Sequence, residues 1–200
     1  MLSLTEVADN PAVLMSRLTL DDGADLVFRP LVHADAEGLA GFLGGLSRET
    51  RRMSPFDGYG LAAAAELCDA IARYDKLRLV IEDVASGRIV GLLEFGFDLV
   101  AGDIARYRDA GIALGPTDCR FGVTLADDHQ GRGVGSRVFP LVTEVARRFG
   151  RERVILFGGV LAENARALRY YEKNGFRAAG SFTGADGVRS LDMIVDLEAP

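Results

Sequence analysis

A run of alternating glycines in the second half of the chain has the residue types to bind an anion. Its members are Gln130, Gly131, Arg132, Gly133, Val134, Gly135 and Ser136. They lie between an apolar stretch ending at Leu125 and an amphipathic helix, whose first N–H groups have no intrahelical partners and carry partial positive charge. Glycines let phosphate oxygens approach such amides closely, and Arg132 adds a charged donor. The run therefore indicates a phosphate site, with a flexible turn as the alternative.

Hydrophobic periodicity predicts the elements that position this turn. Strands are expected at 24–30, 76–82, 88–97, 120–125, 153–160, 176–182 and 190–197. Helices are expected at 34–46, 61–74, 104–109, from about 133 to 149, and 164–174. Pro140 predicts a kink or a late start in the fourth of these helices. The order indicates a mixed α/β chain whose sheet is neither wholly parallel nor wholly antiparallel.

Length and composition predict one domain. The 200 residues are 48% hydrophobic and 26% charged, enough for a single sizeable core. We expect an N-terminal lead-in at residues 1–22, with turns around the segment 12–20, and a single domain at 23–200. The connection 98–118 is long for a compact domain and is expected to cover a substrate site.

Charge and cysteine content narrow the partners. A net charge of −6 argues against nucleic acid and against an anionic membrane surface. Cys68 and Cys119 lack metal-ligand spacing and are expected to be buried free thiols, so no metal is expected. Neither a signal-peptide pattern nor an apolar run of about 18 residues is present, which predicts a cytoplasmic protein.

Two motifs resemble those of a known family. The stretch 123–135 resembles the acetyl-CoA signature of the GNAT superfamily of N-acetyltransferases, Q/R-x-x-G-x-G/A after a strand. Asn164, Ala167 and the run 171–176 resemble its downstream pattern N-x-x-A-x-x-x-Y-E-K-x-G-F. Segments 28–31, 35–36 and 46–51 are similar to the opening of bacterial protein-lysine acetyltransferase domains. The resemblance covers roughly residues 20–197.

The resemblance implies a GNAT fold and an acetyl-CoA site. In this α+β fold a mixed central sheet, flanked by helices on both faces, splays between strands four and five, here 120–125 and 153–160. The pantetheine arm would lie in the splay and pair with the main chain of Val123 and Leu125. An N–H near Val123 would stabilise the developing oxyanion. The pyrophosphate would bind the glycine turn, while Asn164 would contact the pantetheine or phosphate region, cap the last helix, or do both.

The resemblance also assigns catalytic roles. Tyr171 would protonate the departing thiolate, with a core aromatic beside Tyr170 as the alternative. A glutamate base is expected two positions before Gly122, where this chain has Arg120, and arginine cannot accept a proton at neutral pH. As a cation, Arg120 would favour an acceptor that carries a carboxylate or phosphate.

Glu94 is the best replacement base. It interrupts an apolar strand, where a carboxylate has a raised pKa or forms a salt bridge, for instance with Arg120. Both interpretations stay open, and Asp98 and Asp118 are further candidates. His33 is expected at a helix entry and His129 at the surface.

These assignments predict a function and an alternative. The predicted function is transfer of an acetyl group from acetyl-CoA to a primary amine of a small molecule or a protein lysine, by direct transfer in a ternary complex. The alternative, suggested by Arg120, is a non-catalytic acetyl-CoA sensor. A homodimer is compatible with the family.

Overall fold

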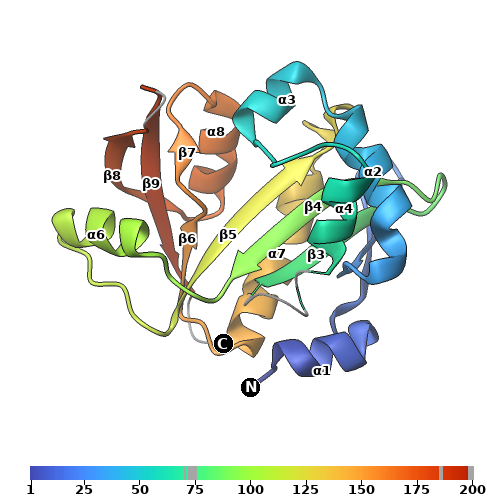
Figure 1. Cartoon of the computed structure of the whole chain (residues 1–200), viewed down its shortest axis with the longest axis horizontal. Coiled ribbons are helices and arrows are strands. Elements are labelled where there is room, and N and C mark those ends of the chain that lie inside the picture. The colour runs from blue at the N-terminus through green and yellow to red at the C-terminus, as the bar shows by residue number, and fades with distance from the viewer. Residues whose placement is uncertain (70, 72–75, 185–186, 198–200) are drawn as a thin grey trace. The chain divides into compact units, whose positions relative to one another are not determined.

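The computed structural model describes residues 1–69, 71, 76–184 and 187–197, and Figure 1 shows its elements along the chain. These residues form two compact units. One contains residues 2–95 and 123–138, and the other contains residue 1 with residues 96–122 and 139–200. The strand β5 (Asp118–Leu125) and the helix α7 (Val134–Arg148) each contribute residues to both units.

The first unit begins with elements that the sequence did not predict. Residues 1–22, expected to be a lead-in, contain α1 (Leu4–Asp9), η1 (Pro11–Leu14) and β1 (Ser16–Thr19). β1 pairs antiparallel with β2 (Asp25–Pro30), with Ser16 opposite Phe28. Four residues with half-exposed side chains carry too weak a hydrophobic pattern to be recognised as a strand.

The remaining elements of this unit include the predicted strands and helices in the predicted order. They are η2 (His33–Asp35), α2 (Ala36–Gly45), α3 (Arg48–Met53), α4 (Leu61–Cys68), β3 (Lys76–Asp83), β4 (Ile89–Gly96) and η3 (Asp127–His129). Of these, α3, η2 and η3 are elements that the sequence did not predict. The predicted helix 61–74 is confirmed as far as Cys68, and residues 70 and 72–75 lie outside the described residues. β2 pairs antiparallel with β3, and β4 is the next strand of the sheet.

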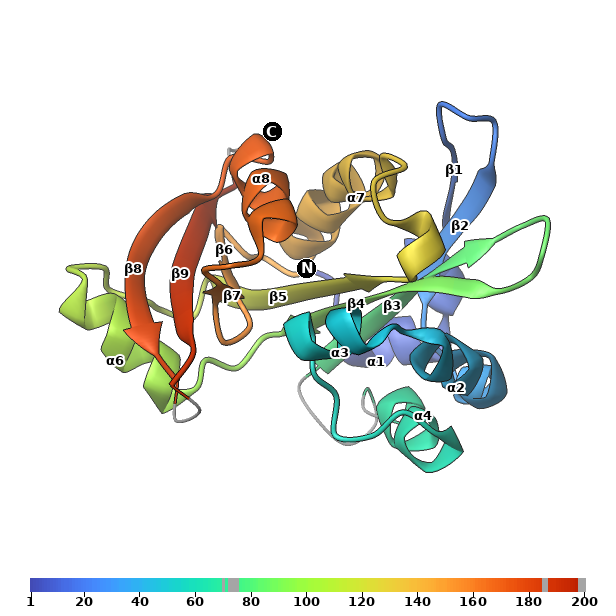
Figure 2. The same ribbon diagram turned by 90° about the horizontal axis from the view of Figure 1, so that it is seen from above.

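Helices cover the sheet of the first unit. Figure 2 shows α2, α3 and α4 on one side of β3 and β4, and the first turn of α7 on the other. Both strands are accordingly buried along nearly their whole length rather than at alternate positions. Leu39 and Leu43 of α2 are fully buried. At Gly91 a Cβ would lie 2.9 Å from side-chain atoms of Ile81 and of Leu125, so these two side chains fill the space.

The second unit combines a parallel strand pair with antiparallel ones. β5 pairs in parallel with β6 (Arg153–Leu156), and β6 pairs antiparallel with β9 (Arg189–Asp196). β9 also pairs antiparallel with β7 (Val160–Leu161) and β8 (Arg177–Thr183). The predicted mixed sheet is therefore confirmed.

Two helices pack on opposite faces of this second part of the sheet (Figure 2). α6 (Ala101–Asp109) buries Tyr107 against Ile155 and Ile194. α8 (Ala165–Lys173) lies on the other face, where the turn after it brings Gly175 against Val195. Neighbouring residues of β9 point to opposite faces, so Ile194 and Val195 serve different helices.

Two sequence predictions are wrong in this region. The strand expected at 153–160 ends at Leu156, because Gly158 (φ +59°) and Gly159 (φ +72°) turn the chain before β7. A Cβ on Gly159 would lie 2.6 Å from the carbonyl oxygen of Leu191, so the close approach needs glycine. Of the two effects expected of Pro140, a kink or a late start, the late start is also wrong, since α7 begins at Val134 and contains this exposed proline.

Candidate active site

The glycine turn contains two residues with left-handed backbone. Gly131 (φ +77°) and Gly133 (φ +83°) are left-handed, and a Cβ at either position would have no neighbouring atom within 4 Å. Gly135 lies in the first turn of α7 and has helical backbone. The N–H of Arg137 donates to the carbonyl of Gly133 at 3.0 Å, so α7 starts its hydrogen bonding at the glycine that ends the turn. N–H groups before Arg137 are those that a helix start offers to an anion.

The polar side chains of the turn contact the protein around it. Gln130 Nε2 donates to the carbonyl of Leu125 at 3.0 Å and to Thr50 Oγ1 at 3.1 Å. Arg132 donates through Nε and Nη2 to Asp22 Oδ2, at 2.9 and 2.7 Å. This bond, together with one from the N–H of Ala24, lowers the pKa of Asp22. The side chain of Arg132, a member of the turn, is therefore a cation paired with Asp22.

His129 is buried, so its predicted surface position is wrong. The residue is 5% exposed, and its Nδ1 lies 2.8 Å from Asp128 Oδ1. Its Nε2 is 3.7 Å from Asp83 Oδ2, at the end of β3. The imidazole thus links the segment before the glycine turn to the β3–β4 hairpin.

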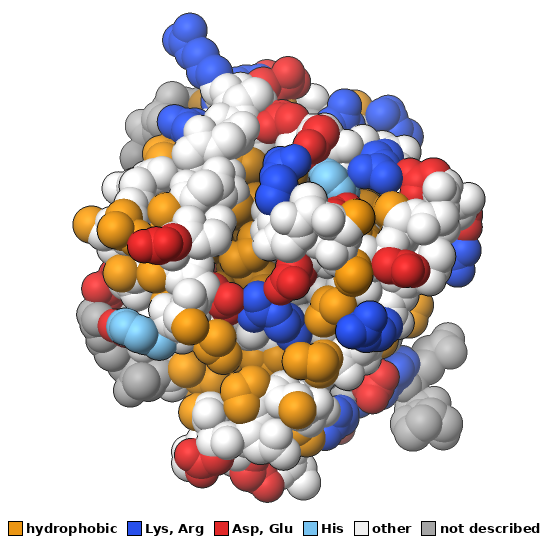
Figure 3. Space-filling model, turned by 90° about the vertical axis from the view of Figure 1, so that its right-hand side faces the viewer, with side chains coloured by type: hydrophobic (Ala, Val, Ile, Leu, Met, Phe, Trp, Pro, Cys, Tyr) orange, Lys and Arg blue, Asp and Glu red, His pale blue; other side chains and the backbone are white. Residues whose placement is uncertain are grey.

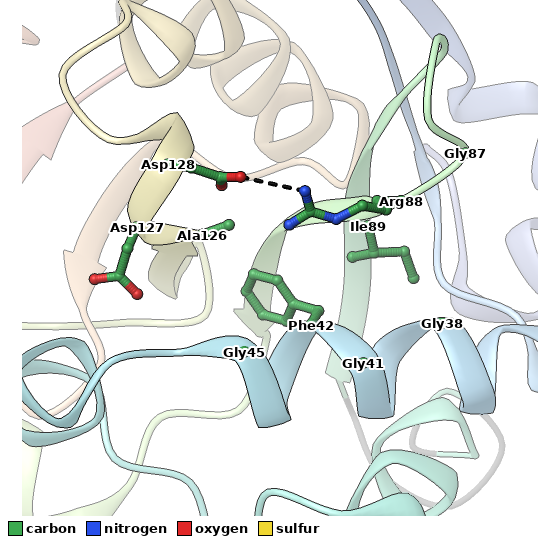
Figure 4. Close-up of a pocket in the computed structure, with 10 residues that line it drawn as sticks. All are labelled: Gly38, Gly41, Phe42, Gly45, Gly87, Arg88, Ile89, Ala126, Asp127 and Asp128. Carbon is green, nitrogen blue, oxygen red and sulfur yellow. Dashed lines mark hydrogen bonds and ion pairs between the residues drawn. The ribbon is translucent and has the colours of Figure 1, made fainter.

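A cavity of about 500 Å³ lies in the same unit. Figure 3 shows this face of the molecule with apolar side chains inside a hollow and charged side chains around it. The lining residues, drawn in Figure 4, are Gly38, Gly41, Phe42, Gly45, Gly87, Arg88, Ile89, Ala126, Asp127 and Asp128. Arg88 reaches Asp128 at 3.2 Å, and Asp127 accepts hydrogen bonds from Ser47 and Thr50. Each charged lining residue therefore has a partner.

Glu94 forms a salt bridge, which is one of the two possibilities that the sequence raised for it. Its Oε1 lies 2.8 Å from Nε of Arg78, whereas the sequence pointed to Arg120 as the partner. The Arg78 side chain is 8% exposed and also donates to the carbonyl of Leu67, while the Glu94 side chain is 25% exposed. Glu94 is thus held in a fixed position with access to solvent.

Tyr171 and Asn164 belong to the second unit. Tyr171 is 7% exposed, with its ring 5.0 Å from that of Tyr170 and 5.1 Å from that of Phe176. Burial raises the pKa of the Tyr171 phenol well above its usual range, so the phenol keeps its proton at neutral pH. Asn164 Oδ1 accepts from the N–H of Ala167 at 3.0 Å, which confirms the predicted helix cap.

Arg120 is part of a chain of alternating charges in the second unit. Its Nε lies 2.7 Å from Asp103 Oδ2, and Asp103 Oδ1 accepts from Arg106 at 2.6 Å. Arg106 donates in turn to both carboxylate oxygens of Asp192. The guanidinium groups of Arg120 and Arg106 lie 4.2 and 4.0 Å from the ring centroids of Phe157 and Phe182. The cation at position 120 is therefore neutralised by α6.

A comparison with protein families identifies the fold. A model of the acetyltransferase (GNAT) family matches residues 47–176, more than half of the chain. The chain belongs to the GNAT acetyltransferase family. The match includes β5, the glycine turn, Asn164 and Tyr171. No similar sequence was found among curated proteins.

Solved GNAT structures share this fold at low sequence identity. The GNAT domain of S. lividans PAT has a TM-score of 0.67 and 22% identity, over 94% of this chain and 99% of that one. The aminoglycoside acetyltransferase AAC(6′)-Ib, in complex with ribostamycin and coenzyme A, has a TM-score of 0.66 and 19% identity, over 86% and 93%. A spermidine N-acetyltransferase SpeG chimera from Vibrio cholerae and hSSAT has a TM-score of 0.62 and 19% identity, over 86% of this chain and 95% of that one.

Other predicted features of this GNAT chain can be located as well. Cys68 and Cys119 are confirmed as buried free cysteines, and burial raises their pKa values to about 11 and about 12. Across the described residues, His, Cys, Asp and Glu side chains form no group of three that could hold a metal ion. No helix in the described part of the chain is long and apolar enough to cross a membrane. His33 lies at a helix entry, as predicted.

Several residues that shape the candidate site were missed by the sequence reasoning. Asp103 and Arg106 have the i, i+3 spacing of a helical ion pair, and Asp192 interrupts an apolar strand as Glu94 does. Asp127 and Thr50 carry weaker signals, because their bond joins residues 77 positions apart. The Asp103–Arg106 spacing and the position of Asp192 could have been recognised from the sequence, whereas the bond between Asp127 and Thr50 could not.

The charge chain makes a prediction about stability. Replacing Asp103 with Asn leaves Arg120 without its buried counter-charge, so the free energy of unfolding should fall by about 3 kcal/mol in a urea titration. Asp109→Asn is the matched control on the same helix, because its contact with Arg108 is exposed and 3.7 Å long. Equal effects of the two variants would contradict the role given to Asp103.

Proposed function

We propose that the chain moves an acetyl group from acetyl-CoA to a primary amine of a small molecule or a protein lysine, by direct transfer in a ternary complex. The observation that carries this proposal is the pair of left-handed glycines, Gly131 and Gly133, immediately before α7 within the matched family region. The structural neighbours named for aminoglycoside and spermidine acetylation support an amine acceptor. The activity is assigned to residues 23–200 as a single domain.

The binding roles follow from the turn and from the family motifs. Main-chain N–H groups of the turn would hold the pyrophosphate, with contributions from the residues Gln130, Gly131, Arg132, Gly133, Val134, Gly135 and Ser136. The left-handed backbone of Gly131 and Gly133 supports this assignment, since glycine adopts it without strain and adds no side chain of its own beside the amides. The main chains of Val123 and Leu125, together with Asn164, would hold the pantetheine arm.

The catalytic roles are assigned to two side chains. Acetyl-CoA supplies the acetyl group as a thioester, and the amine must lose a proton before it can attack. Tyr171, the tyrosine of the family's downstream motif, would protonate the departing sulfur. Glu94 would accept the amine proton, directly or through water, and its bond to Arg78 fixes the carboxylate in place.

A second candidate function is a non-catalytic acetyl-CoA sensor. The observation that favours it is Arg120, which stands where the family resemblance expects a glutamate base and is paired with Asp103. Under this alternative the glycine turn would bind the cofactor in the same way, and no amine would be acetylated.

Gly133→Val tests the turn. A β-branched residue is strained at φ +83°, so affinity for acetyl-CoA measured by calorimetry should fall at least about tenfold. Gly111→Val is the control, because Gly111 (φ +79°) also has open space around its Cβ position but lies in the other unit. It should cost similar stability and keep wild-type affinity. If Gly133→Val binds acetyl-CoA as tightly as the wild type, the turn is not the pyrophosphate site.

Thiol release with a panel of amines separates an enzyme from a sensor. We expect turnover above buffer with at least one amine, and a loss of about 100-fold in Tyr171→Phe, because the sulfur loses its proton donor. Tyr170→Phe keeps the neighbouring aromatic volume and should retain activity. Cofactor binding without turnover on any amine would favour the sensor, and equal activity of both variants would remove the role given to Tyr171.

Glu94→Gln tests the base. The variant keeps the shape of the side chain but cannot take up the amine proton, so turnover should fall and its rise with pH should flatten while acetyl-CoA affinity is unchanged. Glu82→Gln is the control, since Glu82 is another strand glutamate paired with an arginine, Arg29, at 2.8 Å. An unaltered pH profile in Glu94→Gln would place the base elsewhere.

A further inference from the structure

Helix α3 supplies only half of its own N-terminal cap, in which the Ser47 hydroxyl accepts from the N–H of Thr50 at 3.1 Å. Its N-cap is Ser47, and the residue three positions later is Thr50, where a capping box would have Glu or Gln. The helix α1 shows the ordinary arrangement, in which Glu6 of the same helix accepts from the N–H of Ser3 at 2.8 Å. In α3 the equivalent acceptor is Asp127, from the segment between β5 and the glycine turn, at 2.8 Å from the N–H of Ser47.

Asp127 makes this cap with both carboxylate oxygens. Oδ1 accepts from the hydroxyls of Ser47 and Thr50, each at 2.7 Å, and Oδ2 accepts from the Ser47 N–H. Burial acts to raise the pKa of Asp127, but the bonds from Thr50 and Ser47 outweigh it and lower the pKa. The carboxylate is thus ionised and held by three donors from one helix.

Two further contacts join α3 to the proposed cofactor segment. Gln130, the first residue of the glycine turn, donates to Thr50 Oγ1 at 3.1 Å while it also holds the carbonyl of Leu125. At the other end of the helix, the hydroxyls of Ser54 and Thr124 share a hydrogen bond at 2.5 Å. α3 is therefore bonded to β5, to the segment after it and to the turn.

The helix that makes these contacts is itself fixed. Arg51 donates to the carbonyls of Leu43 and Gly44 at the end of α2, at 3.3 and 2.7 Å. Its guanidinium lies 4.2 Å from the ring centroid of Tyr59, beyond α3. A short helix held at both ends is a rigid support for the loop it contacts.

We propose that α3 is a structural support that positions the cofactor site. Thr50 and Asp127 hold the glycine turn in the conformation that binds the pyrophosphate, and Ser54 holds the strand residue Thr124 between the two residues proposed to bind the pantetheine arm. These are positioning residues that act through the turn and the strand. The inference rests on the proposed function, because it assigns a role in acetyl-CoA binding.

The test compares acetyl-CoA with acetyl-pantetheine, which has the thioester arm without the pyrophosphate. Dissociation constants are measured by calorimetry, in competition format for the weaker ligand, for Thr50→Val, Asp127→Asn and Ser54→Ala. Thr50→Val and Asp127→Asn should weaken acetyl-CoA about three- to tenfold, the range of one hydrogen bond, and change acetyl-pantetheine less than about twofold. Ser54→Ala should weaken both ligands. Thr50→Ser retains the hydroxyl, so this variant should bind acetyl-CoA as tightly as the wild type.

Glu49→Gln is the control on the exposed side of α3, and it should leave both affinities unchanged. Melting temperatures show whether each variant is folded. If Thr50→Val loses equal affinity for the two ligands, or loses none for acetyl-CoA, α3 does not have this supporting role. The proposed function would still stand. A wild-type protein that does not bind acetyl-CoA would overturn both.

Discussion

The parallel ladder between β5 and β6 ends before β5 does, and the candidate site depends on this difference. The last register pair is Phe121 with Leu156, followed by the bond from the Phe157 N–H to the Phe121 carbonyl. β6 then turns away at Gly158 and Gly159, whereas β5 continues to Leu125. A strand whose neighbour stops has main-chain groups beyond the end of that ladder. The chain then passes through η3 and the glycine turn to the start of α7 at Val134.

The pairing of buried charges is the second constraint. Arg78 and Asp103 are almost fully buried, and a buried charge without a partner destabilises the fold. Arg78 has Glu94 on the next strand, and Asp103 has arginines on both sides. In each case the pair fixes an element as well as a charge: Arg78 holds the end of α4 through Leu67, and Asp103 holds α6 to β5. Residues that look catalytic by type are thus also parts of the framework.

Local features were predictable from the sequence, and long-range ones were not. The glycine turn and the Asn164 cap depend on neighbouring residues, so residue type and spacing were enough to locate them. The burial of His129 was not predicted, because its contact with Asp83 joins two segments that are distant in the sequence. The break at Gly158 was missed for a similar reason, since the carbonyl that crowds Gly159 belongs to Leu191. Apolar neighbours on both sides of the glycine pair favoured a continuous strand.

Arg120 stands where the sequence resemblance predicts a glutamate base, and its surroundings show how the fold accommodates a cation there. A cation placed where a carboxylate is expected would destabilise the fold if nothing else changed, because its side chain is 14% exposed. Here Asp103 supplies the opposite charge, and Arg106 and Asp192 extend the balance to β9. The exchange is therefore compensated within the second unit. Arginine cannot accept a proton at neutral pH, so the base that we propose is Glu94, whose carboxylate keeps access to solvent beside Arg78.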